Sequence, residues 1–373
     1  MNKPPILIIE NSVAITGALK SLVRSSQQLS KHFHFLFLLP KKSAAIKLVQ
    51  SAGFEVYQMG LRELRKSFFD VLQYLPALIY NSFALKKIVR EHKINLIVVN
   101  DFYNLVPATF KMLDGPIPYI CYVRFLPSKF PATLVKFWCA WHRRYASAIV
   151  AVSKVVEKEL PYRDSVIVIG NELPSEEIRF VSAKKSTTIL YPANYIPGKG
   201  QEYALESWAL ISEKHPQWKL KFVGSDMGLS KNNQYKQSLI ALSQNLQLGH
   251  RVEWGGFSEK ISDEYLDAEI ILNFSQSESF SLTCLEAMFY GRPVIATRSG
   301  GPSEIIDDNV TGILVHLNDI SAMAKAMDYL ISNPSEREAM AHRAFESVRE
   351  KFSYDKTIGK LGELYAQVLH EPS

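Results

Sequence analysis

Cysteine is scarce in this sequence. Only three cysteines occur among 373 residues, at positions 121, 139 and 284, and they lie far apart. An odd and scattered set forms neither a disulfide framework nor a metal-ligating pattern. Scarce, unpaired cysteines are typical of a reducing compartment. We therefore expect a cytoplasmic protein.

Long apolar stretches are also missing. The longest uncharged run of note, residues 71–85, contains Gln73, Pro76 and Asn81 and is shorter than the ~20 apolar residues of a membrane-spanning helix. An early apolar run ends at Glu10, which is too soon for the core of a signal peptide. We expect a soluble protein, or one that lies peripherally on the inner face of a membrane.

Acidic residues are scarce in the first part of the chain. The net charge is +6, but residues 1–170 hold 23 Lys and Arg against 10 Asp and Glu, whereas residues 171–373 hold 20 against 27. A basic first half suggests an anionic partner, such as a lipid-phosphate acceptor, a bilayer surface or an acidic glycan. A well-solvated basic surface explains the same counts equally well.

The rest of the composition is that of a globular protein long enough for two domains, with 47% hydrophobic and 21% charged residues. Apolar runs of strand length alternate with helical patterns up to about residue 170, and a second alternating series starts at residue 187. This alternation predicts an α/β protein with two doubly wound parallel sheets. We predict domains at residues 1–170 and 187–352, a linker at 171–186 and a final helix within 353–373.

Several polar residues follow predicted strands of the first domain. In a doubly wound sheet the ligand lies at the carboxyl ends of the strands, which brings forward Asn11, Asp101, Arg124 and Ser153. Gly17 lies between the first strand and the first helix, so its backbone is a candidate phosphate-facing loop.

Two segments, residues 68–90 and 130–145, interleave aromatic and basic residues. They suit a membrane interface, where aromatic and basic side chains are favoured. The same pattern also describes a helix with one face in the core and a charged face in solvent. We favour the second interpretation, and we interpret His142 as a structural residue.

The strongest functional signal lies in residues 275–304. A predicted strand, a polar turn and a helix that starts near Phe280 or Ser281 follow one another, and the first N–H groups of such a helix form an anion site. Glu278 lies in the loop before this helix, and Glu286 lies on its second turn. A bound diphosphate would have one carboxylate near each of its two substituents. A sugar nucleotide is such a molecule.

The two carboxylates could instead form a hydrolase pair. On a continuous helix they would lie roughly 12 Å apart along the axis, whereas the carboxylates of glycosidases lie roughly 5 to 9.5 Å apart. The spacing favours binding at two ends of one ligand. Gly300 and Gly301, farther along the chain, could belong to the same ligand site, but a simple turn explains them equally well.

The same segment resembles the donor-site signature of glycosyltransferase family 4, which consists of retaining enzymes with the GT-B fold. The match comprises Glu278-x7-Glu286, the run EAMFYGRPVIATRSGGPSEII and residues 312–315. The resemblance implies two Rossmann-like domains that face each other across a cleft, the first for the acceptor and the second for the donor. It also implies a C-terminal helix that crosses back to the N-terminal domain.

The resemblance assigns roles within this segment. It implies that Glu278 faces the donor sugar and that Glu286 binds the ribose hydroxyls. The backbone of Phe280, Ser281 and Leu282 would bind the distal phosphate.

Other positions match the family or depart from it. Lys199 lies near a predicted helix N-terminus and would clamp a diphosphate. The family has an arginine about five residues earlier, where this chain has Asn194, and it often has a histidine where this chain has Arg124. Of the two glycines that often follow the first strand, only Gly17 is present.

The family counterpart of the 252–257 segment contacts the nucleobase, which makes Gly256 and Phe257 candidates for that role. The sequence contains no Asp-x-Asp pair, so a metal-bound diphosphate is not supported. We expect no metal or other cofactor and no nucleic-acid partner.

The leading hypothesis is a retaining, metal-independent glycosyltransferase. It would move a hexose-type sugar from a nucleotide diphosphate sugar to a hydroxyl of a glycan or lipid-linked acceptor, in cell-surface polysaccharide or glycolipid assembly. The departures at Asn194 and Arg124 favour the alternative, a catalytically degenerate protein that binds a nucleotide sugar or a transferase partner. An epimerase or a phosphorylase on the same fold is a third interpretation.

Overall fold

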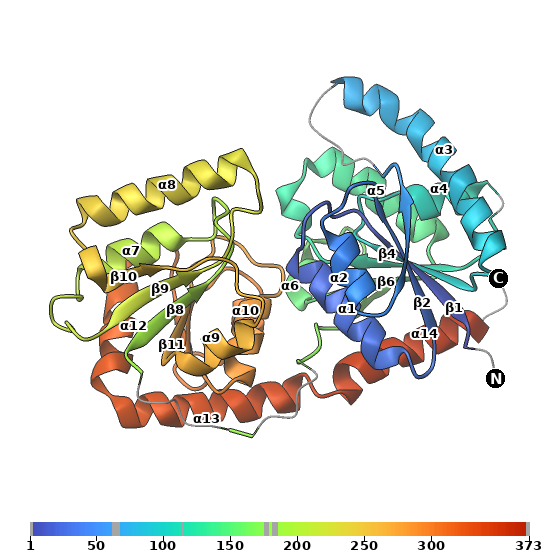
Figure 1. Cartoon of the computed structure of the whole chain (residues 1–373). Helices are drawn as coiled ribbons and strands as arrows, with labels where there is room; N and C mark the ends of the chain where they lie inside the picture. The colour runs from blue at the N-terminus through green and yellow to red at the C-terminus, as the bar shows by residue number, and fades with distance from the viewer. Residues whose placement is uncertain (1–2, 62–67, 114, 175–178, 181–185, 371–373) are drawn as a thin grey trace. The chain divides into compact units, whose positions relative to one another are not determined.

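The computed structural model describes residues 3–61, 68–113, 115–174, 179–180 and 186–370. The chain forms two compact units, residues 1–172 with 354–373, and residues 173–353. The C-terminal helix therefore belongs to the N-terminal unit, as the predicted fold requires. Figure 1 shows both units, each with a parallel sheet between helices.

The first unit contains a seven-stranded parallel sheet with the order β3-β2-β1-β4-β5-β6-β7. Its central strands are buried on both faces, which explains why they read as unbroken apolar runs in the sequence. The strands are β1 (Pro5–Glu10), β2 (His34–Pro40), β3 (Glu55–Met59), β4 (Leu96–Asn100), β5 (Tyr119–Val123), β6 (Ala148–Ala151) and β7 (Val166–Val168).

The strand order of this sheet reverses between β1 and β4. A helix that connects two parallel strands of one sheet makes a right-handed crossover, so the direction of the connection decides which face the helix covers. Helices α1 and α2 therefore cover one face, and α3, α4 and α5 cover the other. The helical segments are α1 (Gly17–Leu29), α2 (Ala45–Ser51), α3 (Phe68–Glu91), α4 (Val106–Met112), η1 (Pro127–Lys129), α5 (Ala132–Tyr145), α6 (Lys154–Glu159), η3 (Asp355–Gly359) and α14 (Lys360–His370).

The second unit contains a six-stranded parallel sheet with the order β10-β9-β8-β11-β12-β13. Its order reverses between β8 and β11, and in open α/β sheets ligands bind at the carboxyl edge beside such a reversal. The strands are β8 (Thr188–Pro192), β9 (Lys219–Val223), β10 (Val252–Trp254), β11 (Ile270–Asn273), β12 (Val294–Thr297) and β13 (Ile313–Val315).

Helices cover the second sheet over an apolar core that includes Tyr191, Trp208 and Phe222. This packing fixes the strands that carry the loops at the carboxyl edge. The helical segments are α7 (Gln201–Ala209), α8 (Ser230–Asn245), η2 (Gly249–Arg251), α9 (Ile261–Asp267), α10 (Leu282–Phe289), α11 (Pro302–Ile305), α12 (Ile320–Ser332) and α13 (Pro334–Lys351).

One sequence prediction needs adjustment, and the interpretation of His142 as a structural residue agrees with its surroundings. The helix after β11 starts at Leu282, because Ser281 has a left-handed backbone (φ 84°) and acts as its N-cap. His142 is buried; its ring nitrogens contact the Tyr119 hydroxyl at 3.1 Å and the Phe102 carbonyl at 2.8 Å. Among the described residues, no helix is long and apolar enough to cross a bilayer.

Candidate functional site

Lys199 and Glu278 meet at the point where the strand order of the second sheet reverses. Lys199 lies in the loop after β8, and Glu278 lies in the loop after β11. Their side chains form an ion pair, with 2.7 Å between Lys199 Nζ and Glu278 Oε1, and are 34% and 14% exposed. Two residues far apart in sequence thus present a cation and an anion at the edge where ligands bind in this fold.

The Lys199 loop is held to the end of β11 by a buried tyrosine. The Tyr191 hydroxyl donates to the Lys199 carbonyl at 2.5 Å and accepts from the Phe274 N–H at 2.8 Å. Gly200 has a left-handed backbone (φ 79°), and a Cβ there would lie 2.0 Å from the Phe274 carbonyl oxygen. This close approach requires glycine. The position of the Lys199 backbone is therefore set by β11.

Asn194 organises the other end of the same loop. Its side-chain oxygen accepts from the Ser225 N–H at 3.0 Å, and its carbonyl accepts from Gln201 Nε2 at 3.0 Å. Gln201 is fully buried. The residue in the family's arginine position therefore joins the loops after β8 and β9 in this structure. Its predicted contact with the donor stays a prediction.

The start of α10 is a well-formed helix N-terminus. Ser281 Oγ accepts from the Cys284 N–H at 3.3 Å and from Asn273 Nδ2 at 2.8 Å, which fixes the cap to the end of β11. Phe280 is buried against the Phe352 ring, with 5.5 Å between ring centroids. The first turn contains no acidic residue, so none of its own side chains offsets the positive end of the helix dipole.

Glu278 is fixed through its backbone to the loop after β12. Its N–H donates to the Ser299 carbonyl at 2.8 Å, and its carbonyl accepts from the Gly301 N–H at 2.8 Å. A Cβ on Gly301 would lie 2.1 Å from the Phe280 carbonyl oxygen. The glycine pair at 300–301 therefore does more than form a turn, because it lets two loops touch behind the carboxylate.

Glu286 lies half-buried on α10, beside the buried Tyr265. Burial raises the pKa of Tyr265 well above its usual range, and the charge of Glu286 raises it further. The hydroxyl of Tyr265 therefore stays protonated. Its hydrogen bond with Thr283, on the same helix, fixes it at the first turn of α10.

The predicted nucleobase residues follow β10. Gly256 is exposed, and its carbonyl accepts from the Gly224 N–H at 3.1 Å. Phe257 has an exposed ring. Gly255, which the sequence analysis did not single out, is the closely packed glycine, since a Cβ there would lie 2.8 Å from the Phe222 carbonyl oxygen. The nucleobase roles of Gly256 and Phe257 stay predictions.

In the first unit, Gly17 and Arg124 have very different surroundings. Gly17 is exposed as the first residue of α1, whose N-cap Thr16 accepts from the Leu19 N–H at 3.2 Å. Arg124 is buried, donates to Ser21 at 3.1 Å and Asn171 at 2.5 Å, and lies over the Tyr122 ring. Its backbone N–H donates to the Asp101 carboxylate at 3.0 Å.

Three buried carboxyl groups lie near Arg124, at the point where the first sheet reverses its strand order. They belong to Glu10, Asp101 and Glu172. Burial raises the pKa of Asp101 and of Glu172 to about 7 each, and it also raises the pKa of Glu10. Asp101 accepts from the N–H groups of Arg124 and Phe125 at 3.0 and 3.1 Å. These polar groups hold the loops of the first unit.

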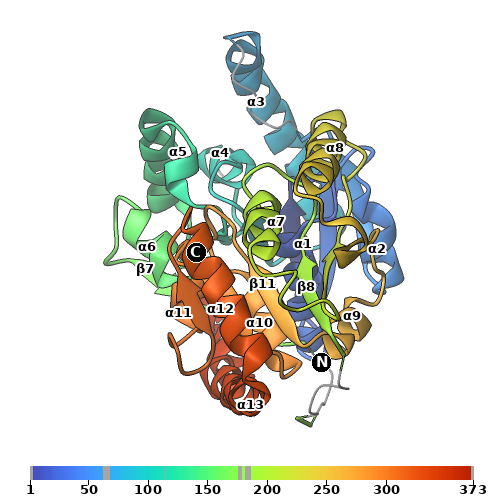
Figure 2. The ribbon, with the colours of Figure 1, turned by 90° about the vertical axis from the view of Figure 1, so that its left-hand side faces the viewer.

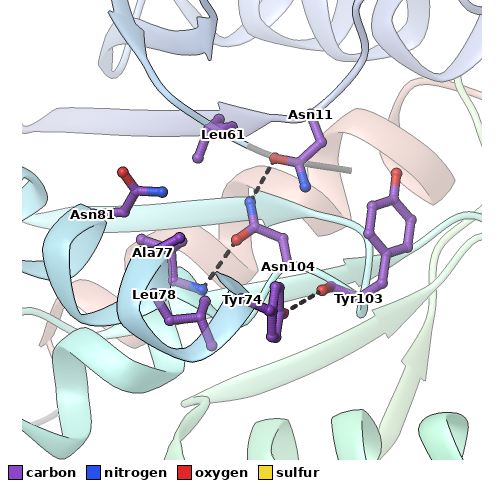
Figure 3. Close-up of a pocket in the computed structure, with 9 residues that line it drawn as sticks. Asn11, Leu61, Tyr74, Ala77, Leu78, Asn81, Tyr103 and Asn104 are labelled. Carbon is purple, nitrogen blue, oxygen red and sulfur yellow. Dashed lines mark hydrogen bonds between the residues drawn. The ribbon is translucent and has the colours of Figure 1, made fainter. Parts of the chain in front are cut away.

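Figure 3 shows a small cavity beside these loops. Asn104 donates to Asn11 at 2.8 Å, and the Tyr74 hydroxyl donates to the Tyr103 carbonyl at 3.2 Å. The cavity measures about 20 Å³, which is enough for about one water molecule. It is too small for a sugar. Among the described residues, no group of three or more His, Cys, Asp or Glu side chains is arranged to hold a metal ion.

Comparisons with known proteins relate this chain to glycosyltransferases. Residues 174–347 match the family described as glycosyl transferases group 1. An uncharacterized glycosyltransferase of Haemophilus influenzae is 24% identical over 303 residues, which cover 79% of this chain and 80% of that protein. The N-acetyl-alpha-D-glucosaminyl L-malate synthase of Bacillus anthracis is 32% identical over 134 residues, which cover 36% of this chain and 35% of the synthase.

A solved structure matches over both units. The crystal structure of Anabaena HepE in complex with UDP-glucose has a TM-score of 0.80 at 19% identity and covers 98% of this chain and 99% of that chain. Identity this low shows the fold alone, which is the GT-B fold, as predicted. The predicted resemblance to glycosyltransferases is confirmed through the match to glycosyl transferases group 1, and membership in family 4 in particular stays a prediction.

Proposed function

We propose that this chain, whose residues 174–347 match the glycosyl transferases group 1 family, transfers a hexose-type sugar from a nucleotide diphosphate sugar to a hydroxyl of a glycan or lipid-linked acceptor. The proposal includes retention of the anomeric configuration and independence from metal. One observation carries it: Lys199, Glu278 and the N-terminus of α10 converge at the strand reversal of the second sheet.

Each group has a distinct task in the proposed reaction. When the bond between the sugar and the diphosphate breaks, negative charge grows on the departing oxygen. Lys199 and the backbone N–H groups of Phe280, Ser281 and Leu282, which lead into α10, would stabilise that charge. Glu278 would accept hydrogen bonds from the sugar hydroxyls. The acceptor oxygen forms the new bond to the sugar as its O–H bond breaks, and the proton passes to the departing diphosphate.

Three further positions complete the proposed donor site. Glu286 would accept hydrogen bonds from the ribose hydroxyls, and Gly256 and Phe257 would contact the base. Arg124 stays a candidate for binding the diphosphate of the donor. In this structure its guanidinium is bonded to Ser21 and Asn171, so it would have to exchange those partners in order to act.

The donor is best identified by thermal unfolding with UDP, GDP, ADP and their common sugar conjugates. A ligand at a hundred times its dissociation constant adds about 2.7 kcal/mol to the free energy of unfolding. We expect a shift with one base only, its loss in Glu286→Ala, and its retention in the control Glu259→Ala, which changes an exposed carboxylate after β10. No shift with any nucleotide would contradict the proposed donor site.

Turnover is tested separately, by release of nucleoside diphosphate in the presence of candidate acceptors. We expect the rate to be unchanged by a chelator and the product to have the anomeric configuration of the donor. Inversion, or loss of activity on chelation that added metal restores, would contradict those parts of the proposal.

The alternative of a binding protein without turnover has one structural observation in its favour. Asn194 uses its side chain to hold Ser225, and it offers no cation where the family has an arginine. A donor-dependent thermal shift without turnover on any acceptor, and without slow hydrolysis of the donor, would favour this alternative.

A further inference from the structure

Helix α5 has two faces that differ from those of an ordinary surface helix. Its inner face is buried through Val135, Trp138, Cys139 and His142. The outer face is also apolar in part, because Leu134 and Phe137 are exposed, the latter by 42%. A row of rings continues along the helix at Phe137, Trp141 and Tyr145, with centroids 5.7 and 5.8 Å apart. The buried inner face therefore accounts for Trp138 and does not account for the row of Phe137, Trp141 and Tyr145.

The charges on α5 have one sign. The helix carries Lys136, Arg143 and Arg144, and it contains no Asp or Glu. The guanidinium of Arg144 lies 5.6 Å from the centre of the Tyr145 ring, and that of Arg143 lies 4.7 Å from the centre of the Tyr162 ring. Cations and aromatic rings thus share one exposed surface.

The neighbouring helices continue this surface. Helix α4 packs against both α3 and α5, and Figures 1 and 2 show the three helices together on the same side of the first unit. Their exposed apolar residues are Ile79, Tyr80, Phe83, Met112, Leu134 and Phe137. We call this surface the α3–α5 face. Tyr80 is the most exposed of the six, at 74%.

The α3–α5 face is also basic. Lysines and arginines occur on all three helices, whereas α4 and α5 have no acidic residue and α3 has only Asp70 and Glu91. The basic residues are Lys86, Lys87, Arg90, Lys111, Lys136, Arg143 and Arg144. Seven basic and two acidic residues on these three helices give a positive balance on a layer that also exposes aromatic and aliphatic side chains.

The rest of the first unit behaves differently. Among the described residues, none of the helices α1, α2, α6 and α14 carries an exposed large apolar side chain. The other exposed large apolar residues described in this unit lie on separate loops and on β7, at Val13, Phe125, Ile167 and Tyr354. Apolar exposure is therefore greatest on the layer of α3, α4 and α5. A concentrated apolar patch with a polar rim marks an interaction site.

We propose that the α3–α5 face docks on an anionic lipid bilayer. Aromatic rings are favoured at the interface of a bilayer, and basic side chains are attracted to anionic headgroups. Exposed rings and an excess of basic residues satisfy both requirements, although Lys87 is paired with Glu91 on α3 (3.7 Å). The proposal goes beyond the transfer reaction, and it would bring a lipid-linked acceptor to the same surface as the enzyme.

The test is flotation of the full chain with vesicles of phosphatidylcholine alone and of phosphatidylcholine with phosphatidylglycerol. We expect binding to the anionic vesicles only, and weaker binding as salt is raised. Lys136→Glu with Arg144→Glu should lower the bound-to-free ratio by about tenfold or more, since each basic residue near the surface contributes to binding. Phe137→Ser with Tyr80→Ser should lower it severalfold at all salt concentrations.

Matched controls lie in the second unit. Lys219→Glu with Lys231→Glu makes the same charge change at exposed positions, and Leu210→Ser removes an exposed leucine. Both should bind anionic vesicles far better than the α3–α5 variants. Every variant is also tested for the nucleotide-dependent thermal shift, which reports folding and the donor site independently of lipid.

Three outcomes would overturn the proposal. One is the absence of binding to anionic vesicles, and another is equal loss of binding in control and α3–α5 variants. The third is self-association of the chain that the α3–α5 variants abolish, because a second copy would then cover the face.

Discussion

The two sheets of this protein use the same topological position in opposite ways. In the second unit, the strand reversal between β8 and β11 carries one ion pair, Lys199 with Glu278, which is still partly exposed. In the first unit, the reversal between β1 and β4 lies beside Glu10, Asp101 and Arg124, all of them buried. Charges that stay within reach of solvent can exchange partners with a ligand. Charges that are buried and bonded hold loops in place.

Removal of the lysine amine should produce the largest effect. Lys199→Ala takes away the cation proposed to stabilise the departing diphosphate, and loss of one such group costs about 10²–10³ in kcat. The check is the initial rate of nucleoside diphosphate release. Lys236→Ala, in the same unit, is the control and should keep most of the activity. A Lys199→Ala enzyme with normal kcat would contradict the proposed division between the two units.

Arg124→Ala tests the buried charges at the strand reversal of the first unit. It leaves Ser21, Asn171 and the nearby carboxylates buried without the guanidinium, so we expect a loss of about 3 kcal/mol in the free energy of unfolding. Urea unfolding provides the measurement. If instead stability is kept and transfer is lost, Arg124 acts on the donor, and the contrast between the two strand reversals is wrong.

The buried carboxyl groups of the first unit should also make stability depend on pH. The pKa of Asp101 is raised from 3.8 to about 7 in the folded protein. The folded state therefore binds a proton that the unfolded chain has released, and the free energy of unfolding falls as the pH rises from about 4 to 7.

Asp101→Asn tests this dependence directly. Asparagine tolerates the left-handed backbone of this position (φ 82°) and keeps a side-chain oxygen for the two N–H donors. We expect a shallower slope between pH 4 and 7, measured by urea unfolding at several pH values. The exposed control Asp164→Asn should keep the original slope. An unchanged slope in Asp101→Asn would show that this carboxyl group does not titrate in that window.

The smallest expected effect concerns the support of the Lys199 loop. Tyr191→Phe removes the hydroxyl that joins Lys199 to Phe274, and we expect kcat to fall about tenfold, as about 1.4 kcal/mol of lost transition-state stabilisation implies. The acceptor KM should not change. Steady-state kinetics well below the unfolding temperature provide the measurement.

The matched control is Tyr195→Phe, which removes a hydroxyl that donates to the Gly255 carbonyl at 3.2 Å in the same unit. It should keep kcat within about twofold. If both variants lose activity equally, the hydroxyl of Tyr191 contributes general stability and does not position Lys199.

Much of the fold could be predicted because parallel strands that are buried on both faces appear in the sequence as short runs of apolar residues. The start of α10 was predicted to within two residues, since a polar turn after such a run favours a helix cap. The sequence did not reveal the left-handed backbone of Ser281, because serine rarely adopts it and tertiary contacts with Asn273 impose it.

The candidate site was predicted only in part, for a similar reason. Lys199 and Glu278 were found by their separate motifs, but their pairing depends on two loops that only the sheet order brings together. Tyr191 was missed because a tyrosine within an apolar strand reads as core. Its hydroxyl becomes informative only when the atoms that it joins are known.

The ion pair between Lys199 and Glu278 has a consequence for the end of the proposed catalytic cycle. An intact donor that separates the ion pair gives each residue a new partner. Its phosphates contact the ammonium of Lys199, and its sugar hydroxyls donate to the carboxylate of Glu278. The nucleoside diphosphate product has no sugar, so it contacts only the ammonium and leaves the largely buried Glu278 carboxylate without a partner. Closure of the pair would then compete with the product for Lys199 and favour its departure.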